Sequence, residues 1–205
     1  MLNFIDIVGQ DAVLSRLQRN LAAERLHHGF LFSGMRGIGR RTTAEALAKL
    51  LLCENRQIAP NAGRVSYLTD DELLELPCDE CESCTLMEAG THTDYHYVYK
   101  ELAQYHDDAD VRQRKMQMLS LPVVKQFLLD PADRAPSRGV GKVFVIREAE
   151  LMSLDAQNAF LKTLEEPPPG VTMILLTQKA ENLLPTTRSR CSAFRFAPLP
   201  EPFVI

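Results

Sequence analysis

The stretch "HGFLFSGMRGIGRRTTAEALAKL", residues 28–50, decides the fold of this chain. It opens with a short apolar run, 28–34, that ends in glycine and predicts a buried strand. Gly34, Gly37 and Gly39 form a turn-prone segment, and the apolar residues that follow recur at helical spacing. A strand, a glycine-rich turn and a helix in succession are typical of a loop whose backbone amides cradle a phosphate.

This loop departs from the phosphate-loop pattern at two positions. The pattern G-x-x-x-x-G-K-[ST] puts a lysine on the terminal phosphates and a hydroxyl on Mg²⁺. Gly34 and Gly39 have the required separation, but Arg40 stands at the lysine position and Arg41 at the hydroxyl position. Taken alone, the segment also fits a glycine turn that only caps a helix. The helix N-terminus and Arg40 would still attract anions.

Composition limits the class of protein. With 205 residues, of which 45% are hydrophobic and 24% charged, the chain can bury one full core and one small appended module. No apolar run approaches the roughly 18 residues of a membrane helix, and the N-terminus lacks the blocks of a signal peptide. We therefore expect a cytosolic protein that does not enter a membrane. The net charge of −4 argues against non-specific wrapping of nucleic acid over the whole surface.

Further strands and helices alternate along the chain. We expect strands at 94–99, 142–146, 171–177 and 192–199, and helices at 121–132 and 153–166. Strands without polar alternation, separated by helices, predict a parallel sheet covered on both faces. Residues 54–93 are polar and turn-rich, and the charged segment 100–117 reads as a solvated helix or a mobile insertion.

A second element of a nucleotide site follows the strand 142–146. Such a strand should end in two acids, one for Mg²⁺ and one to orient the attacking water. Here Arg147 stands at the magnesium position and Glu148 follows it. A cation at that position repels Mg²⁺, so Arg41 and Arg147 together remove both protein ligands of the metal. The loop, residues 147–148 and Thr177 all fall at carboxyl ends of strands, where ligands bind in this fold class.

Four of the five cysteines form a candidate metal site. In a cytosolic chain, a C-x₂-C-x₂-C cluster indicates metal rather than a disulfide. Four thiolates form a closed, structural zinc site, here from Cys53, Cys78, Cys81 and Cys84. The alternative is a set of reduced, metal-free surface cysteines. His92 and His96 are spare ligands, for which a role in the loop or strand is favoured.

Two further motifs connect these features to a known family. "LKTLEEPPPG" (161–170) and "LLPTTRSRC" (183–191), together with "IVGQ" (7–10) and the glycine loop, closely resemble the AAA+ clamp-loader subunits of bacterial DNA polymerase III. The resemblance covers nearly the whole chain, apart from the stretches around 56–76 and 100–118.

The resemblance implies an α/β fold: a P-loop AAA+ (RecA-like) domain with a five-stranded parallel sheet flanked by helices. It implies that this domain spans 1–197, with a small zinc module inserted at about 53–90 and held by the four cysteines. Residues 198–205 would begin a linker to a helical lid domain that is absent here.

The resemblance also assigns roles to single residues. The family's ATPase subunits keep the loop Lys and Thr and an Asp-Glu pair, whereas its delta-prime class does not hydrolyse ATP and lends an arginine to a neighbour. This chain looks like the delta-prime class, which makes Arg190 of "SRC" an arginine finger acting in trans. Thr177 matches the family's sensor position. The degenerate and inactive nucleotide site would comprise Gly34, Gly37, Gly39, Arg40, Arg41, Arg147, Glu148 and Thr177. From the residues alone, Arg190 also fits a surface arginine, and Thr177 a strand-end hydroxyl that bonds backbone.

The implied function is that of a non-catalytic subunit in the bacterial cytoplasm. It would join gamma/tau-like ATPase subunits and a delta-like subunit in a hetero-pentameric ring that loads the sliding clamp on primed DNA. Zn²⁺ would be structural, and ATP would not be hydrolysed by this chain. Two alternatives stay open: an active AAA+ ATPase with an atypical loop, and a zinc-stabilised interaction module without an ATPase partner.

Overall fold

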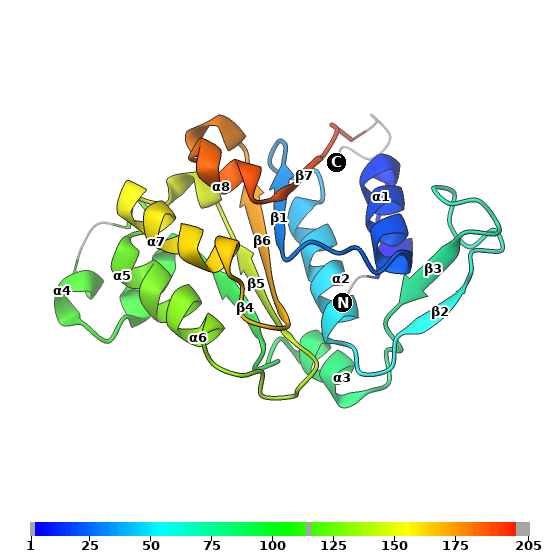
Figure 1. Ribbon diagram of the computed structural model, residues 1–205, viewed down its shortest axis with the longest axis horizontal. Helices are drawn as coiled ribbons and strands as arrows, with labels where there is room; N and C mark the ends of the chain where they lie inside the picture. The colour runs from blue at the N-terminus through cyan, green and yellow to red at the C-terminus, as the bar shows by residue number, and fades with distance from the viewer. Residues whose placement is uncertain (1–2, 114–115, 200–205) are drawn as a thin grey trace.

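A five-stranded parallel sheet forms the centre of the computed structural model, which describes residues 3–113 and 116–199 (Figure 1). The strand order is β4-β5-β6-β1-β7. The strands are β1 Gly29–Ser33, β4 Tyr95–Val98, β5 Lys142–Ile146, β6 Val171–Thr177 and β7 Ser192–Arg195. The five expected strands and their parallel arrangement are therefore confirmed.

The two faces of the sheet bury separate hydrophobic clusters because successive residues of a strand point to opposite faces. On one face Phe30 and Phe32 pack with α1 Asp11–Ala22 and α2 Arg40–Leu52. On the other face Leu31 packs with the helices at 121–132 and with α7 Leu154–Glu165. Figure 1 shows α1 and α2 on one side of the sheet and α5, α6 and α7 on the other. Burial on both faces explains why the strands lack polar alternation.

Both expected helices on the second face are present. Ser153 caps α7, and its Oγ accepts a hydrogen bond from the Ala156 N–H at 3.2 Å. The helix at 121–132 consists of α5 Leu121–Val124, a π-helical turn Lys125–Leu129 and α6 Asp130–Ala132. The π turn precedes Pro131, which has no N–H to continue the regular ladder.

The segment between α2 and β4 is more structured than the sequence analysis expected. It contains an antiparallel hairpin, β2 Gln57–Pro60 and β3 Leu73–Leu76, followed by α3 Glu82–Ala89. The long hairpin loop is closed by the buried Asn61 side chain, which bonds the backbone of Val65 and Leu68. On α1, the Gln18 amide exchanges two hydrogen bonds with the Glu75 backbone and fixes β3 against the main domain.

The charged segment after β4 forms two short helices where it is described. A 3₁₀ helix spans Lys100–Tyr105 and α4 spans Ala109–Arg112, whereas residues 114–115 lie outside the described part of the chain. Ala103 and Val111 are buried in the second hydrophobic cluster, so this segment is packed on the domain and is not a solvated arm. Among the described residues, no helix is both long and apolar enough to cross a membrane.

α8 Pro185–Ser189 leads into β7 at the edge of the sheet. Its first residue is a proline, which suits the first turn of a helix because no N–H is needed there.

Candidate functional site

The glycine loop has the backbone shape that the sequence analysis anticipated. Gly34, Gly37 and Gly39 adopt φ angles of +151°, +85° and +94°. A side chain at Gly34 would place Cβ 2.6 Å from Ile38 Cδ1 and 2.9 Å from the Phe196 carbonyl oxygen, so only glycine fits. Gly39 is the N-cap of α2, so the first N–H groups of that helix face the loop.

A cavity of about 330 Å³ opens beside this loop, at the carboxyl ends of the strands. Its lining includes most of the expected site and adds residues that the sequence analysis missed, above all Arg36, Tyr97 and Glu150. The expected residues that line it are Gly37, Gly39, Arg40, Arg41, Arg147 and Glu148. Arg36 lies inside the glycine loop, and Glu150 lies two residues after Glu148. Their positions within these two motifs could have indicated that they line the site.

The Arg40 side chain turns back onto the protein. Its guanidinium donates a hydrogen bond to the carbonyl oxygen of Thr177, which also accepts the Gly34 N–H at 3.2 Å. Burial lowers the pKa of Arg40, and the Glu150 carboxylate partly opposes that effect. The residue at the lysine position therefore ties the loop to the end of β6.

Arg41 is also held by neighbours within the chain. Its Nε lies 2.7 Å from Glu45 Oε1, one helical turn along α2. The guanidinium carbon lies 4.5 Å from the centre of the Tyr97 ring, within the range of a cation–π contact. The residue at the hydroxyl position thus offers a cation in place of a magnesium ligand.

The acid that remains at the end of β5 is surrounded by positive charge. Glu148 Oε2 lies 3.6 Å from Arg147 Nε and 3.9 Å from Lys100 Nζ. Glu148 adopts φ +51°, which is unusual for a residue with a side chain and marks a constrained turn at the pocket. Its carboxylate is therefore largely balanced by cations of the protein itself.

Thr177 is fully buried at the end of β6. Its hydroxyl accepts the Lys179 N–H at 3.1 Å, which is the backbone contact that a strand-end threonine commonly makes. Thr177 does not line the cavity, although its neighbours Leu176 and Gln178 do.

The fold brings Cys53 to the three cysteines of the C-x₂-C-x₂-C motif, and the four form one compact cluster. All four Sγ atoms lie within 4.8 Å of one another, and Cys53 Sγ lies 3.5 Å from Cys78 Sγ and 4.0 Å from Cys81 Sγ. A tetrahedral zinc ion with Zn–S bonds of about 2.3 Å separates its sulfur ligands by about 3.8 Å. The cluster therefore has the dimensions and the donor set for a metal ion.

The environment of the thiols also suits a cation. The N–H groups of Cys78, Cys81 and Cys84 each donate to a sulfur of the cluster at 3.3 to 3.4 Å. Although burial alone would raise the pKa of Cys78, the N–H groups of Glu80 and Cys81 bring it down to about 7. Burial raises the pKa of Cys53 and of Cys84. A bound cation would offset that cost and hold these two sulfurs as thiolates.

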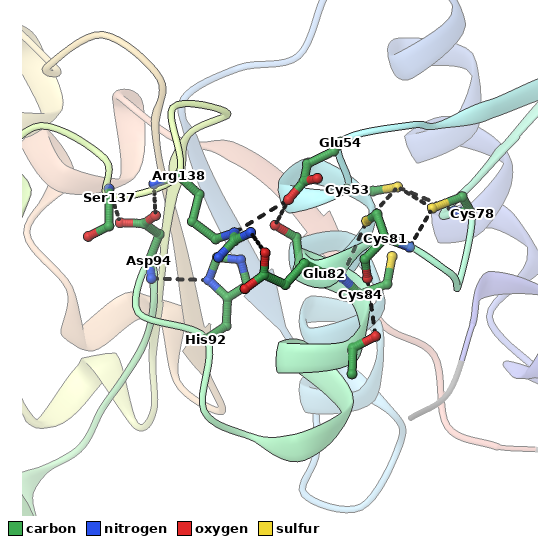
Figure 2. Close-up of polar contacts among 12 residues, drawn as sticks. Cys53, Glu54, Cys78, Cys81, Glu82, Cys84, His92, Asp94, Ser137 and Arg138 are labelled. Carbon is green, nitrogen blue, oxygen red and sulfur yellow. Dashed lines mark hydrogen bonds and ion pairs between the residues drawn. The ribbon is translucent and has the colours of Figure 1, made fainter.

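Two cationic side chains connect the cluster to the rest of the domain, and Figure 2 shows the first of them, Arg138. Arg138 bridges Glu54 and Glu82, the residues that directly follow Cys53 and Cys81. The N–H of Arg138 also donates to the buried carboxylate of Asp94 at 3.0 Å, at the entrance to β4.

The second cation, Lys49 of α2, pairs with Asp79, which lies between Cys78 and Cys81, and with Glu88 of α3. The Lys49 side chain is only 2% exposed, so these pairs anchor the module on the core.

Neither histidine considered as a spare ligand joins the cysteine cluster within the described residues. His92 Nδ1 accepts the Asp94 N–H at 3.1 Å. His96 stacks on Phe144, with ring centres 4.6 Å apart. Their roles in the loop and the strand agree with the interpretation that the sequence favoured.

Arg190 lies between α8 and β7, at the amino ends of the strands, whereas the cavity lies at their carboxyl ends. Its backbone carbonyl approaches Gly29, the first residue of β1, whereas the glycine loop follows Ser33, the last. Five residues of strand span about 16 Å. The Arg190 side chain therefore cannot serve the cavity of its own domain.

Comparison with known proteins then decides the family. Residues 9–200 match the family model described as "DNA polymerase III, delta subunit". The chain belongs to this clamp-loader family. It is 35% identical over 196 residues to DNA polymerase III subunit tau of Salmonella typhimurium and of Escherichia coli, which covers 96% of this chain and 26% of each relative. It is 33% identical to subunit gamma of Buchnera aphidicola, of which it covers 44%.

Solved structures agree on the fold. A DNA polymerase III gamma subunit-related protein of Thermotoga maritima superposes with a TM-score of 0.54 at 19% identity, over 95% of this chain and 47% of that one. A single-substitution variant of RuvB from the same organism gives a TM-score of 0.52 at 15% identity, over 95% and 46%. The expected P-loop AAA+ fold is confirmed. The chain spans about a quarter to just under half of the length of these clamp-loader relatives and structures.

Proposed function

We propose that this clamp-loader family member is a non-catalytic subunit of the delta-prime type. Its own nucleotide site would lack Mg²⁺ ligands, and it would contribute Arg190 to the site of a neighbouring ATPase subunit. The observation that carries the proposal is the pair Arg41 and Arg147, which line the cavity at the two positions where the metal needs a hydroxyl and a carboxylate.

Electrostatics oppose a bound Mg²⁺ in this cavity. At an effective dielectric constant of 20, two like unit charges 4 Å apart repel by about 4 kcal/mol, and Mg²⁺ carries two. The retained acid Glu148 faces Arg147 and Lys100 and so offers little compensation. Hydrolysis of ATP in this domain would therefore lack both the metal and its ligands.

The location of Arg190 supports a role in trans. The cavity and Arg190 lie at opposite ends of the parallel strands, so a ring of such domains could bring each end against a different neighbour. A guanidinium stays charged at neutral pH and matches the developing charge on a transferring phosphoryl group. Arginines in that role increase the rate by about 10³ to 10⁵ in some phosphoryl-transfer enzymes.

The partners and cofactor follow from the same proposal. The chain would assemble with gamma/tau-type ATPase subunits and a delta-like subunit in a five-membered ring in the cytoplasm. Through that complex it would act on the sliding clamp and primed DNA. The cysteine cluster would hold a structural Zn²⁺, because four thiolates leave no open position for water. It would form a zinc module at about 53–90 within an AAA+ domain of residues 1–197, with residues 198–205 leading toward a lid domain.

Calorimetric titration of the chain with ATP, with and without Mg²⁺, tests the proposal that its own nucleotide site is inactive. We expect no Mg²⁺-dependent binding and no turnover. Micromolar, Mg²⁺-dependent binding with turnover would instead establish an active ATPase. The similarity to the tau and gamma relatives, at 33–35% identity, favours that alternative. The experiment therefore distinguishes a non-catalytic subunit from an active ATPase.

Substitution of Arg190 tests the other half. In a complex reconstituted with a tau/gamma-type ATPase subunit, Arg190→Ala should leave assembly intact and lower the ATPase rate by at least tenfold. Arg190→Lys should rescue poorly, because an ammonium lacks the planar fork that meets two phosphate oxygens. A chain that does not assemble with such subunits would point to the zinc-stabilised interaction module instead.

A further inference from the structure

The Arg190 side chain is not free in the isolated domain. Its Nη2 lies 2.6 Å from Oε1 of Glu165, and its Nη1 donates to the carbonyl oxygen of Thr186 at 3.0 Å. The side chains of Arg190 and Glu165 are 35% and 48% exposed. The guanidinium is therefore held in one place at the surface while part of it stays accessible.

The fold brings this pair together from two separate motifs. Glu165 is the last residue of α7, and Arg190 follows α8. A side chain at Gly29 would come within 3.2 Å of both the Arg190 carbonyl oxygen and the Leu164 side chain, so glycine there permits the close packing. A cation at the C-terminus of a helix is also favoured by the helix dipole, which adds to the attraction by Glu165.

The two contacts leave donors for a ligand. A guanidinium has five N–H groups, and the contacts with Glu165 and Thr186 take up one on each terminal nitrogen. Three N–H groups stay available, enough for two oxygens of a phosphoryl group. The orientation of the guanidinium plane is meanwhile fixed, which reduces the side-chain entropy that a flexible arginine would lose on engaging a ligand.

We infer that Glu165 is a positioning residue for Arg190: it holds the guanidinium at the edge of the domain, ready for the phosphates of a neighbouring subunit. This inference rests on the proposed role of Arg190 in trans. Glu165 itself touches no phosphate and acts only through the arginine.

The test is steady-state ATP turnover by the complex reconstituted with a tau/gamma-type ATPase subunit. Glu165→Ala should lower kcat about tenfold and leave the KM for ATP unchanged, because the nucleotide is bound by the neighbour and only the arginine is misplaced. Glu165→Gln keeps an oxygen acceptor at the same reach and should retain most of the rate. Glu166→Gln is the matched control, since Glu166 is also exposed and makes no ion pair within the described residues.

A double variant distinguishes the failure of this inference from the failure of the proposed function. If Glu165 acts through Arg190, then adding Glu165→Ala to Arg190→Ala should change nothing further. A full rate for Glu165→Ala beside a low rate for Arg190→Ala would overturn the positioning role and leave the finger intact. The positioning role would also be overturned if Glu165→Ala lowered the ATPase rate by the same factor in the Arg190→Ala background as it does alone. A normal rate for Arg190→Ala would instead reject the proposed function.

Discussion

Replacement of Cys53 by serine should loosen the cysteine module on the domain. Cys53 ends α2, and the other three cysteines lie 25 to 31 positions further along the chain. With a metal ion bound, Cys53 is the ligand that closes the long loop carrying the hairpin. Its loss should therefore remove the cross-link that restricts this loop in the unfolded chain.

The expected loss follows from the length of that loop. A cross-link that closes a 25-residue segment restricts the unfolded chain by about 3.5 kcal/mol in the chain-entropy treatment. For a domain of about 200 residues, each kcal/mol of stability changes Tm by about 2–4 °C. Cys53→Ser should thus lower Tm by about 7–14 °C, while the sheet, which helices cover on both faces, keeps its secondary structure.

Thermal unfolding followed by circular dichroism measures this loss, with zinc content determined by elemental analysis on the same samples. Cys191→Ser is the matched control, because Cys191 is the fifth cysteine and lies outside the cluster. A chelator should lower the Tm of the unsubstituted chain by a similar amount and have no further effect on Cys53→Ser.

Two results would refute this reasoning. One is a chain purified without chelator that holds less than one zinc ion per molecule. The other is a Cys53→Ser variant that loses no more stability than Cys191→Ser.

Three further predictions concern charge. Burial, followed by the Lys142 cation, lowers the pKa of His96 from 6.5 to about 4. Between pH 6.5 and 4 the unfolded chain therefore binds a proton at this histidine that the folded chain does not. The free energy of unfolding should fall by up to about 3 kcal/mol as pH drops through that range. Denaturant titrations of His96→Phe should show a smaller change of unfolding free energy with pH. Arg40→Lys, Arg41→Thr and Arg147→Asp combined should create Mg²⁺-dependent ATP binding by calorimetry, and the lack of any gain would show that other groups block the site. Arg138→Met should speed zinc release to a colorimetric chelator, and an unchanged rate would remove it from the support of the cluster.

The strands of the main sheet could be predicted from the sequence because each is marked by residues within its own segment. Uninterrupted apolar runs such as 142–146 and 171–177 exclude amphipathic helices of that length, and Ser153 and the residues after Glu166 mark where α7 begins and ends. The glycine loop was recognisable for the same reason, since positive φ angles at close backbone contacts require glycine. The C-x₂-C-x₂-C spacing likewise predicted a metal site from residues close together in the sequence.

Only the tertiary structure decided the features that depend on contacts between distant residues. The hairpin β2–β3 escaped the sequence analysis because Ile58 and Leu73 face outward and leave no alternating pattern. The pairing of Arg138 with Glu54 joins residues 84 positions apart, and the pairing of Arg190 with Glu165 joins two motifs. No local pattern encodes which opposite charges meet, because that is fixed only when β7 docks beside β1 and brings Arg190 to the end of α7. The sequence shows which side chains are charged, and the packing of the strands determines which of them form ion pairs.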